Sequence, residues 1–143
     1  MSDLDPLLVN LTLSGPCATR EPAATLAAAA VARGFGVYRI DLGGIGDKAA
    51  LMRHLQDALQ FPEWFGRNWD ALEDCLTDMS WHDDVGYVLL FAGGGTLRRH
   101  DKALFHTLVD VLKSAADYWR GAERPFWAFF LDLPPDVTLP GFP

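Results

Sequence analysis

The sequence predicts an α/β fold, in which a small parallel sheet of three to four strands is packed with helices. Strand-like and helix-like patterns alternate along the chain, and this alternation requires crossover connections of the kind that join parallel strands. Two segments, residues 87–92 (YVLLFA) and 126–131 (FWAFFL), are apolar almost throughout, as strands buried on both faces are. The 143 residues, half of them hydrophobic, suffice for one globular domain with a sizeable core.

The first 34 residues are expected to supply one strand and one helix. Residues 7–13 (LLVNLTL) have a strand-like pattern and are followed by a Gly-Pro-Cys turn. Residues 21–34 (EPAATLAAAAVARG) are predicted to form a helix, because Pro22 suits a first helical turn and Gly34 a C-terminal stop.

The next segment predicts a strand and then a helix. Residues 36–42 (GVYRIDL) alternate between two sets of side chains, as the two faces of a strand do, and lead into a Gly-rich turn. Asp47 is placed to cap a helix that Pro62 ends. The apolar stripe of this helix consists of Leu51, Leu55 and Leu59.

The remaining elements are predicted from caps and periodicity. Asn68 is a natural N-cap for a helix over residues 69–80, whose apolar residues recur at helical spacing. Residues 93–100 (GGGTLRRH) are expected to be a flexible connecting loop, and residues 101–120 a long helix. The tail, residues 134–143, contains four prolines and is expected to run extended along the surface.

The composition argues against several classes of protein. Cys17 and Cys75 are the only cysteines, and no CxxC or Cys/His spacing accompanies them, so we expect reduced thiols and no metal site. No apolar run is long enough to span a bilayer, and the N-terminus is acidic where a secretory signal would be basic. We therefore expect a cytoplasmic protein that needs no cofactor.

The net charge of −7 is concentrated in one stretch. Residues 63–84 hold seven acids and a single base, Arg67, whereas the rest of the chain is nearly balanced, with 12 acids and 11 bases. An acidic patch repels the phosphates of nucleic acids and favours a basic partner through steering and complementarity. The simpler interpretation is a solvated helix face that keeps the protein soluble.

The acids are crowded on one side of the helix that Asn68 caps. Asp70 falls at the second helical position, where the helix dipole favours a carboxylate. Asp74 lies four residues further on, and like charges at this spacing cost about 0.2–0.5 kcal/mol. Together with Thr77 and Asp78, these acids face away from the apolar side of the helix, an arrangement that suits a cationic partner.

Residues 62–76 (PEWFGRNWDALEDCL) carry a more specific signal. They closely resemble the signature of the barstar family, small bacterial inhibitors of barnase-type ribonucleases, in which P-x-aromatic-aromatic-G-x-N-x-D-A-L-x-D-C-L opens the inhibitory helix. The order of elements predicted for residues 36–131 also matches the βααβαβ order of that family. The resemblance implies a barstar-like domain over residues 35–133, preceded by an added strand and helix in residues 1–34 and followed by the Pro-rich tail.

The resemblance implies an intracellular inhibitor of the antitoxin or immunity type, a monomer when free, that blocks the active site of a basic barnase-like ribonuclease. Such a protein is not an enzyme and contacts neither nucleic acid nor membrane. The family's inhibitory helix inserts an acidic side chain into the phosphate-binding site of the ribonuclease, and Asp74 stands at that place here. The implied partner-binding residues are Trp64, Gly66, Asn68, Asp70, Glu73, Asp74 and Thr77.

The resemblance also assigns roles within this set. Asp70 matches a second key carboxylate, Trp64 matches an aromatic that stacks on the nuclease, and Gly66 and Asn68 shape the loop before the helix. Two positions depart from the best-known member of the family, which has an aromatic residue in place of Glu73 and a further acid in place of Ser114. These departures bear on the choice of partner.

Two other functions remain open for the same residues. One is a protein-interaction module whose basic partner is not a nuclease, and the sequence does not separate it from the inhibitor. The other is a small enzyme or a site for a hard cation that uses the Asp70–Asp74 pair. No second cluster of ligands and no suitably spaced histidine accompanies this pair. We therefore favour the ribonuclease inhibitor and the interaction module over the enzyme or cation site.

Overall fold

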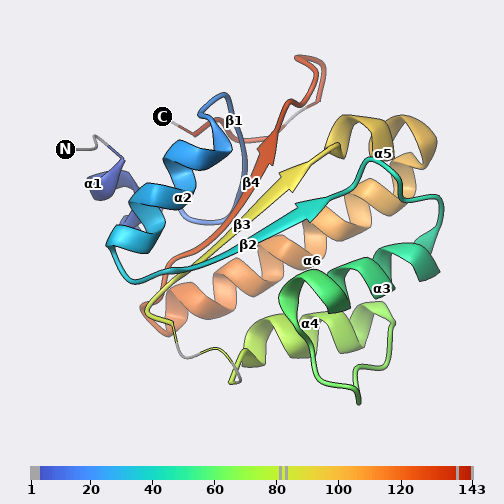
Figure 1. The fold of residues 1–143 in the computed structure, drawn as a ribbon, viewed down its shortest axis with the longest axis horizontal. Coiled ribbons are helices and arrows are strands. Elements are labelled where there is room, and N and C mark those ends of the chain that lie inside the picture. The colour runs from blue at the N-terminus through green and yellow to red at the C-terminus, as the bar shows by residue number, and fades with distance from the viewer. Residues whose placement is uncertain (1–3, 81, 83, 138, 143) are drawn as a thin grey trace.

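The computed structural model describes residues 4–80, 82, 84–137 and 139–142 and contains a four-stranded sheet with helices on both faces (Figure 1). The strands are β1 (Pro16–Thr19), β2 (Gly36–Asp41), β3 (Tyr87–Ala92) and β4 (Phe126–Leu131). They lie in the order β1-β4-β3-β2, and every neighbouring pair is parallel. The α/β prediction, with an additional N-terminal strand and helix, is confirmed.

The helices are divided unequally between the two faces of the sheet. The shorter layer consists of α1 (Asp5–Leu8) and α2 (Ala23–Ala32). The larger layer consists of α3 (Lys48–Leu59), α4 (Trp69–Asp78), α5 (Gly94–His100) and α6 (Lys102–Gly121). None of the described helices is both long and apolar enough to cross a membrane.

The two central strands separate two hydrophobic clusters. Val88 and Leu90 of β3 point into the cluster beneath α1 and α2, whereas Leu89 and Phe91 point into the cluster beneath α3 to α6. β4 alternates in the same way, with its largest side chain, Trp127, on the α2 side. Both faces are therefore buried, which explains why these strands are continuously apolar in sequence.

The N-terminal segment differs from the sequence prediction. Residues 7–13 were expected to form a strand, but α1 ends at Leu8 and turns follow. Pro6 stands in the first helical turn, where its missing N–H group has no helical partner to lose. The Asn10 side chain accepts a hydrogen bond from the Leu13 N–H at 3.2 Å, a local bond that competes with strand pairing. The edge strand is instead β1, where a turn was expected.

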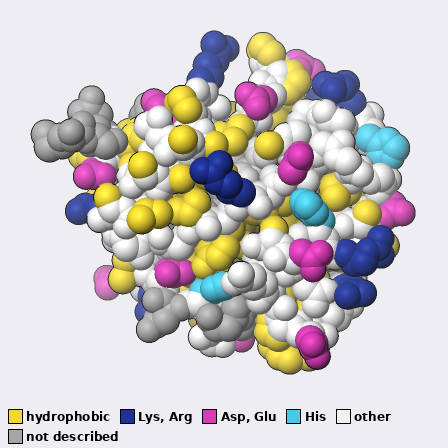
Figure 2. All heavy atoms as spheres, in the orientation of Figure 1, with side chains coloured by type: hydrophobic (Ala, Val, Ile, Leu, Met, Phe, Trp, Pro, Cys, Tyr) yellow, Lys and Arg dark blue, Asp and Glu magenta, His cyan; other side chains and the backbone are white. Residues whose placement is uncertain are grey.

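Specific contacts hold residues 4–34 on the sheet. The Trp127 indole donates a hydrogen bond to the Leu8 carbonyl at 2.9 Å, and Arg120 of α6 donates to the carbonyls of Leu11 and Ser14 at 2.8 and 2.6 Å. Leu26 of α2 is fully buried. The outward side of α2 carries no charge, and Figure 2 shows hydrophobic side chains gathered over this helix.

The predicted loop at residues 93–100 is a helix, α5. Its glycines serve close packing. Gly93 has φ +74° beside the Gly43 backbone, and a Cβ on Gly95 would come within 2.9 Å of the Pro134 ring. The last turn is basic, with Arg98, Arg99 and His100 near the negative end of the helix dipole. The glycines that favoured a loop in the sequence thus mark close approaches of the backbone.

The other boundaries agree closely with the prediction. α4 ends two residues early, because Met79 adopts the left-handed conformation with φ 51°. Asp101 caps α6, and its carboxylate accepts a hydrogen bond from the Leu104 N–H at 3.1 Å.

The tail differs in part from the expected extended segment, because residues 134–137 form a turn closed by the Val137 N–H and the Pro134 carbonyl at 3.1 Å. Residues 139–142 lie beside β1, where Ala18 exchanges backbone hydrogen bonds of 2.9 Å with Pro140 and Phe142.

Replacing Leu26 by Ala tests whether α2 unfolds together with the sheet. Because Leu26 is fully buried, Leu26→Ala should lower the free energy of unfolding by about 2–5 kcal/mol. Urea unfolding, followed by both circular dichroism and tryptophan fluorescence, should show one shifted transition. The exposed neighbour Thr25, changed to Ala, should alter stability by less than about 0.5 kcal/mol. Two unfolding transitions, of which the larger keeps its midpoint, would contradict a shared core. They would support the domain division at residue 34, which stays a prediction.

Candidate partner-binding site

The acidic helix α4 begins at a side-chain cap. The Asn68 side-chain oxygen accepts a hydrogen bond from the Ala71 N–H at 2.8 Å, which confirms the predicted cap. The Asn68 amide also donates to the Gly66 carbonyl at 3.4 Å. A Cβ on Gly66 would lie 3.4 Å from both the Ala71 Cβ and the Asn68 amide nitrogen, which is an ordinary contact distance.

The loop before α4 is fixed by contacts with α3. Gln56 donates a hydrogen bond to the Pro62 carbonyl at 3.2 Å and accepts one from the Arg67 guanidinium at 2.9 Å, so that one α3 side chain spans the loop. The buried rings of Phe61 and Phe65 pack at a centroid distance of 5.0 Å. Arg67 has a positive φ of 55°, a conformation that these contacts hold in place.

The inner side of α4 is tied to the core. Leu72, Cys75 and Leu76 are buried, and α4 packs against α6. The Trp119 indole of α6 donates a hydrogen bond of 2.7 Å to the Leu76 carbonyl, which belongs to the last turn of α4 and has no partner within the helix. The helix is therefore fastened at its start by Asn68 and at its end by Trp119.

The outer side of α4 carries a row of carboxylates. Asp70, Asp74 and Asp78 follow one another at four-residue spacing and are all exposed, with the exposed Glu73 beside them. Among the residues that the structure describes, none of these acids takes part in an ion pair. Each neighbouring pair in the row costs about 0.2–0.5 kcal/mol, and Asp78 stands in the last turn, where the helix dipole disfavours a carboxylate.

A shallow hollow of about 550 Å³ lies beside this row. It is lined by Asn68, Asp70 and Asp74 together with Lys48, the first residue of α3. The Lys48 ammonium sits 5.9 Å from the centre of the Trp69 ring. Sequence reasoning missed Lys48, because this residue lies on α3, twenty residues before Asn68, and no local pattern links it to α4. The structure thus places one cation at the edge of the acidic surface.

The other predicted residues occupy different settings. Trp64 projects from the loop with 66% of its surface exposed. The Thr77 hydroxyl donates to the Glu73 carbonyl of its own helix at 2.8 Å, so it is only half exposed and is turned toward the backbone. Ser114 is exposed on α6.

One acid of the predicted acidic stretch, Asp84, has a hydrogen-bond partner outside that stretch. Its carboxylate accepts a hydrogen bond from the Tyr38 hydroxyl at 2.8 Å. Burial and this carboxylate together raise the pKa of Tyr38. Asp83 and Trp81, which belong to the same acidic stretch, lie outside the described residues.

The two cysteines are free and buried, as expected for reduced thiols. Burial raises the pKa of Cys17 to about 12. The pKa of Cys75 is raised to about 11, chiefly by burial and further by the charges of Asp78 and Asp74 on the turn around it. Both are therefore neutral at pH 7. Within the described part of the chain, no three His, Cys, Asp or Glu side chains are grouped as metal ligands would be.

Comparison with known families supports the resemblance found in the sequence. A family model described as Barstar (barnase inhibitor) matches residues 35–131, more than half of the chain. The chain belongs to the barstar family. The matched residues include α4 and the loop before it, and they leave out β1, α1, α2 and the C-terminal tail. The comparison with individual curated proteins found no match.

Asn68 should contribute to stability as a helix cap, separately from any role in binding. Asn68→Ala removes the acceptor of the Ala71 N–H and should lower the free energy of unfolding by about 1 kcal/mol. Asn68→Asp keeps an acceptor there and should retain most of that stability. Urea denaturation of both variants measures the difference. An equally large loss in the two variants would contradict the capping role.

Proposed function

We propose that this barstar-family chain is an inhibitor that blocks the active site of a basic barnase-like ribonuclease with the outer face of α4. The observation that carries the proposal is the row of exposed acids at positions 70, 74 and 78, which has no ion-pair partner among the described residues. The row opposes helix stability, so it calls for a role outside the folded chain.

The chemistry of a ribonuclease supplies the complementary charge. Such an enzyme gathers Arg, Lys and His around the scissile phosphate and therefore has a concentrated positive field in its cleft. The carboxylates of Asp70 and Asp74 can accept charge-assisted, often bidentate hydrogen bonds from guanidinium groups. The acidic face then takes the place of the RNA phosphates, and inhibition requires no chemical step and no cofactor.

The rigidity of the site supports tight binding. The Asn68 cap, the Gln56 bridge and the Trp119 hydrogen bond hold α4 and its loop before any partner arrives. Side chains presented on such a frame lose little further conformational entropy on binding. The exposed Trp64 adds a large aromatic surface at small entropic cost beside the acids.

The roles of the acids follow from the family resemblance. By that resemblance Asp74, in the middle of the row, is the principal anchor, and Asp70 is the second carboxylate. Glu73 and Ser114 are the positions at which partner choice would differ from that of other members. Within this proposal the protein is not an enzyme, and it acts in the cytoplasm as an antitoxin or immunity protein. The alternative is a basic partner that is not a nuclease, which would use the same acidic face.

The first test is inhibition itself. We expect the purified chain to abolish RNA cleavage by a barnase-type ribonuclease at one-to-one stoichiometry, with no added metal or cofactor, because steric and electrostatic blocking is sufficient. Titration of the nuclease with the chain, using a fluorogenic RNA substrate, measures this. Full activity at saturating chain concentration, with a complex still formed in solution, would favour the interaction module instead.

Asp74→Ala should separate stability from binding. Removing Asp74 relieves two like-charge contacts, so the fold should be as stable or slightly more stable. Its complex with the ribonuclease should weaken by at least about 2 kcal/mol, mostly through faster dissociation, because the partner's cations lose their counter-charge. Thermal unfolding measures the stability of the variant, and surface plasmon resonance on the same protein measures its dissociation rate from the ribonuclease.

The control for this variant is Asp57→Ala, which removes the same charge from the exposed side of α3. Asp57 lies nine residues after Lys48, and at 3.6 residues per turn it projects from the side of α3 opposite the hollow. Its dissociation rate should equal that of the unmodified chain. If Asp74→Ala also dissociates at that rate, Asp74 does not belong to the site.

A further inference from the structure

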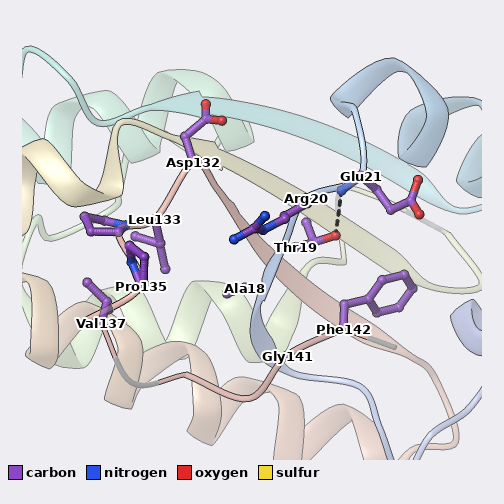
Figure 3. A pocket seen from close by; sticks show the side chains of 11 residues that line it. Ala18, Thr19, Arg20, Glu21, Asp132, Leu133, Pro135, Val137, Gly141 and Phe142 are labelled. Atoms are coloured by element: carbon purple, nitrogen blue, oxygen red, sulfur yellow. Dashed lines mark hydrogen bonds between the residues drawn. The ribbon is translucent and has the colours of Figure 1, made fainter.

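The two segments outside the family match meet in a crevice of about 810 Å³. One wall comes from the end of β1 and the residues after it, and the other from the residues after β4 and the C-terminal tail (Figure 3). The crevice is larger than the hollow beside α4 and lies on a different part of the fold. The function proposed for α4 does not involve this crevice.

The crevice lies where parallel sheets most often bind ligands. It opens at the carboxyl ends of β1 and β4, which are neighbours in the sheet. The chain leaves β1 toward α2 on one face of the sheet, whereas it leaves β3, the next strand beyond β4, toward α5 on the other face. Connections that diverge in this way create a crevice outside the strand ends, the usual ligand position in open α/β sheets.

One charged group is directed into the space. Figure 3 shows the Arg20 guanidinium reaching across toward Leu133 and Pro135, whereas the carboxylates of Glu21 and Asp132 point away from it. Arg20 is exposed, and among the described residues none forms an ion pair or side-chain hydrogen bond with it. Its planar guanidinium is suited to bidentate binding of a carboxylate or phosphate.

Apolar side chains line parts of the crevice. Leu133 and Val137 pack against the cluster beneath α3 to α6, whereas Phe142 packs against the cluster beneath α1 and α2. The Phe142 ring is held in place by edge-on contacts with Trp127 and Phe129, at centroid distances of 5.3 and 4.9 Å. The volume of the crevice lies in the range of small-molecule sites, about 300–1,000 Å³.

We propose that this crevice binds a small organic anion, with its carboxylate or phosphate on the Arg20 guanidinium and its apolar body against Leu133 and Val137. Such a ligand joins the end of β1 to the tail. The site is independent of the ribonuclease-binding role of α4, and each can exist without the other.

The experiment uses the full ¹⁵N-labelled chain and four probes of similar shape that differ in charge. Benzoate and phenyl phosphate carry the two candidate anionic groups, benzamide is neutral, and benzamidine is a cation. Titration followed by amide chemical shifts should move resonances of residues 18–21, 132, 133, 136, 137, 141 and 142 with one or both anions. The anion that binds more tightly identifies the preferred group. Benzamide and benzamidine should bind at least about tenfold more weakly, because neither accepts the charge-assisted bonds of Arg20.

Two variants complete the test. Arg20→Gln should weaken binding of the anions by at least about tenfold. Arg39→Gln makes the same charge change on β2, at the far edge of the sheet, and should leave affinity unchanged. The proposal is overturned if neither anion shifts these resonances at millimolar concentration, if benzamidine binds as tightly as the anions, or if Arg20→Gln binds them like the unmodified chain.

Discussion

The constraint on which the rest of the structure depends is that a wholly parallel sheet must be buried on both faces. The larger helical layer, α3 to α6, covers only one of them. Val88, Leu90 and Trp127 point the other way, and α1 and α2 cover these side chains. The N-terminal segment, which lies outside the family match, therefore completes the core of the sheet that carries the family's domain. Buried apolar contacts and hydrogen bonds from Trp127 and Arg120 hold that cover in place.

Because only the inner face of α4 packs into the core, its outer face can carry residues that do not favour the helix. Stability comes from Leu72, Cys75 and Leu76 below, while the exposed acids above oppose it by a small amount. Natural proteins commonly accept such local conflicts where a surface has to meet a partner. The helix can tolerate the conflict because both of its ends are fastened.

Local signals allowed much of this to be predicted from the sequence. The caps at Asp47 and Asn68 lie within three residues of the groups they satisfy, and the apolar runs of β3 and β4 are read directly from the chain. Apart from residues 7–13, where a local hydrogen bond of Asn10 competes with a strand, the failures involve distant partners. The glycines of α5 resembled a flexible loop because their close contacts, with Gly43 and Pro134, are far away in sequence. The bridge from Gln56 to the loop and the position of Lys48 beside Trp69 likewise depend on how α3 packs near α4.

The pairing of the tail with β1 has a consequence for how this protein behaves at high concentration. An unpaired edge strand is a template on which another chain can add a strand, and such addition leads to aggregation. Here the backbone of Ala18 is already occupied by Pro140 and Phe142. The opposite edge, β2, instead exposes Arg39 and Asp41, charges that discourage a neighbouring sheet from approaching. Residues 139–142 of the proline-rich tail thereby cover part of the β1 edge and hinder self-association through the sheet.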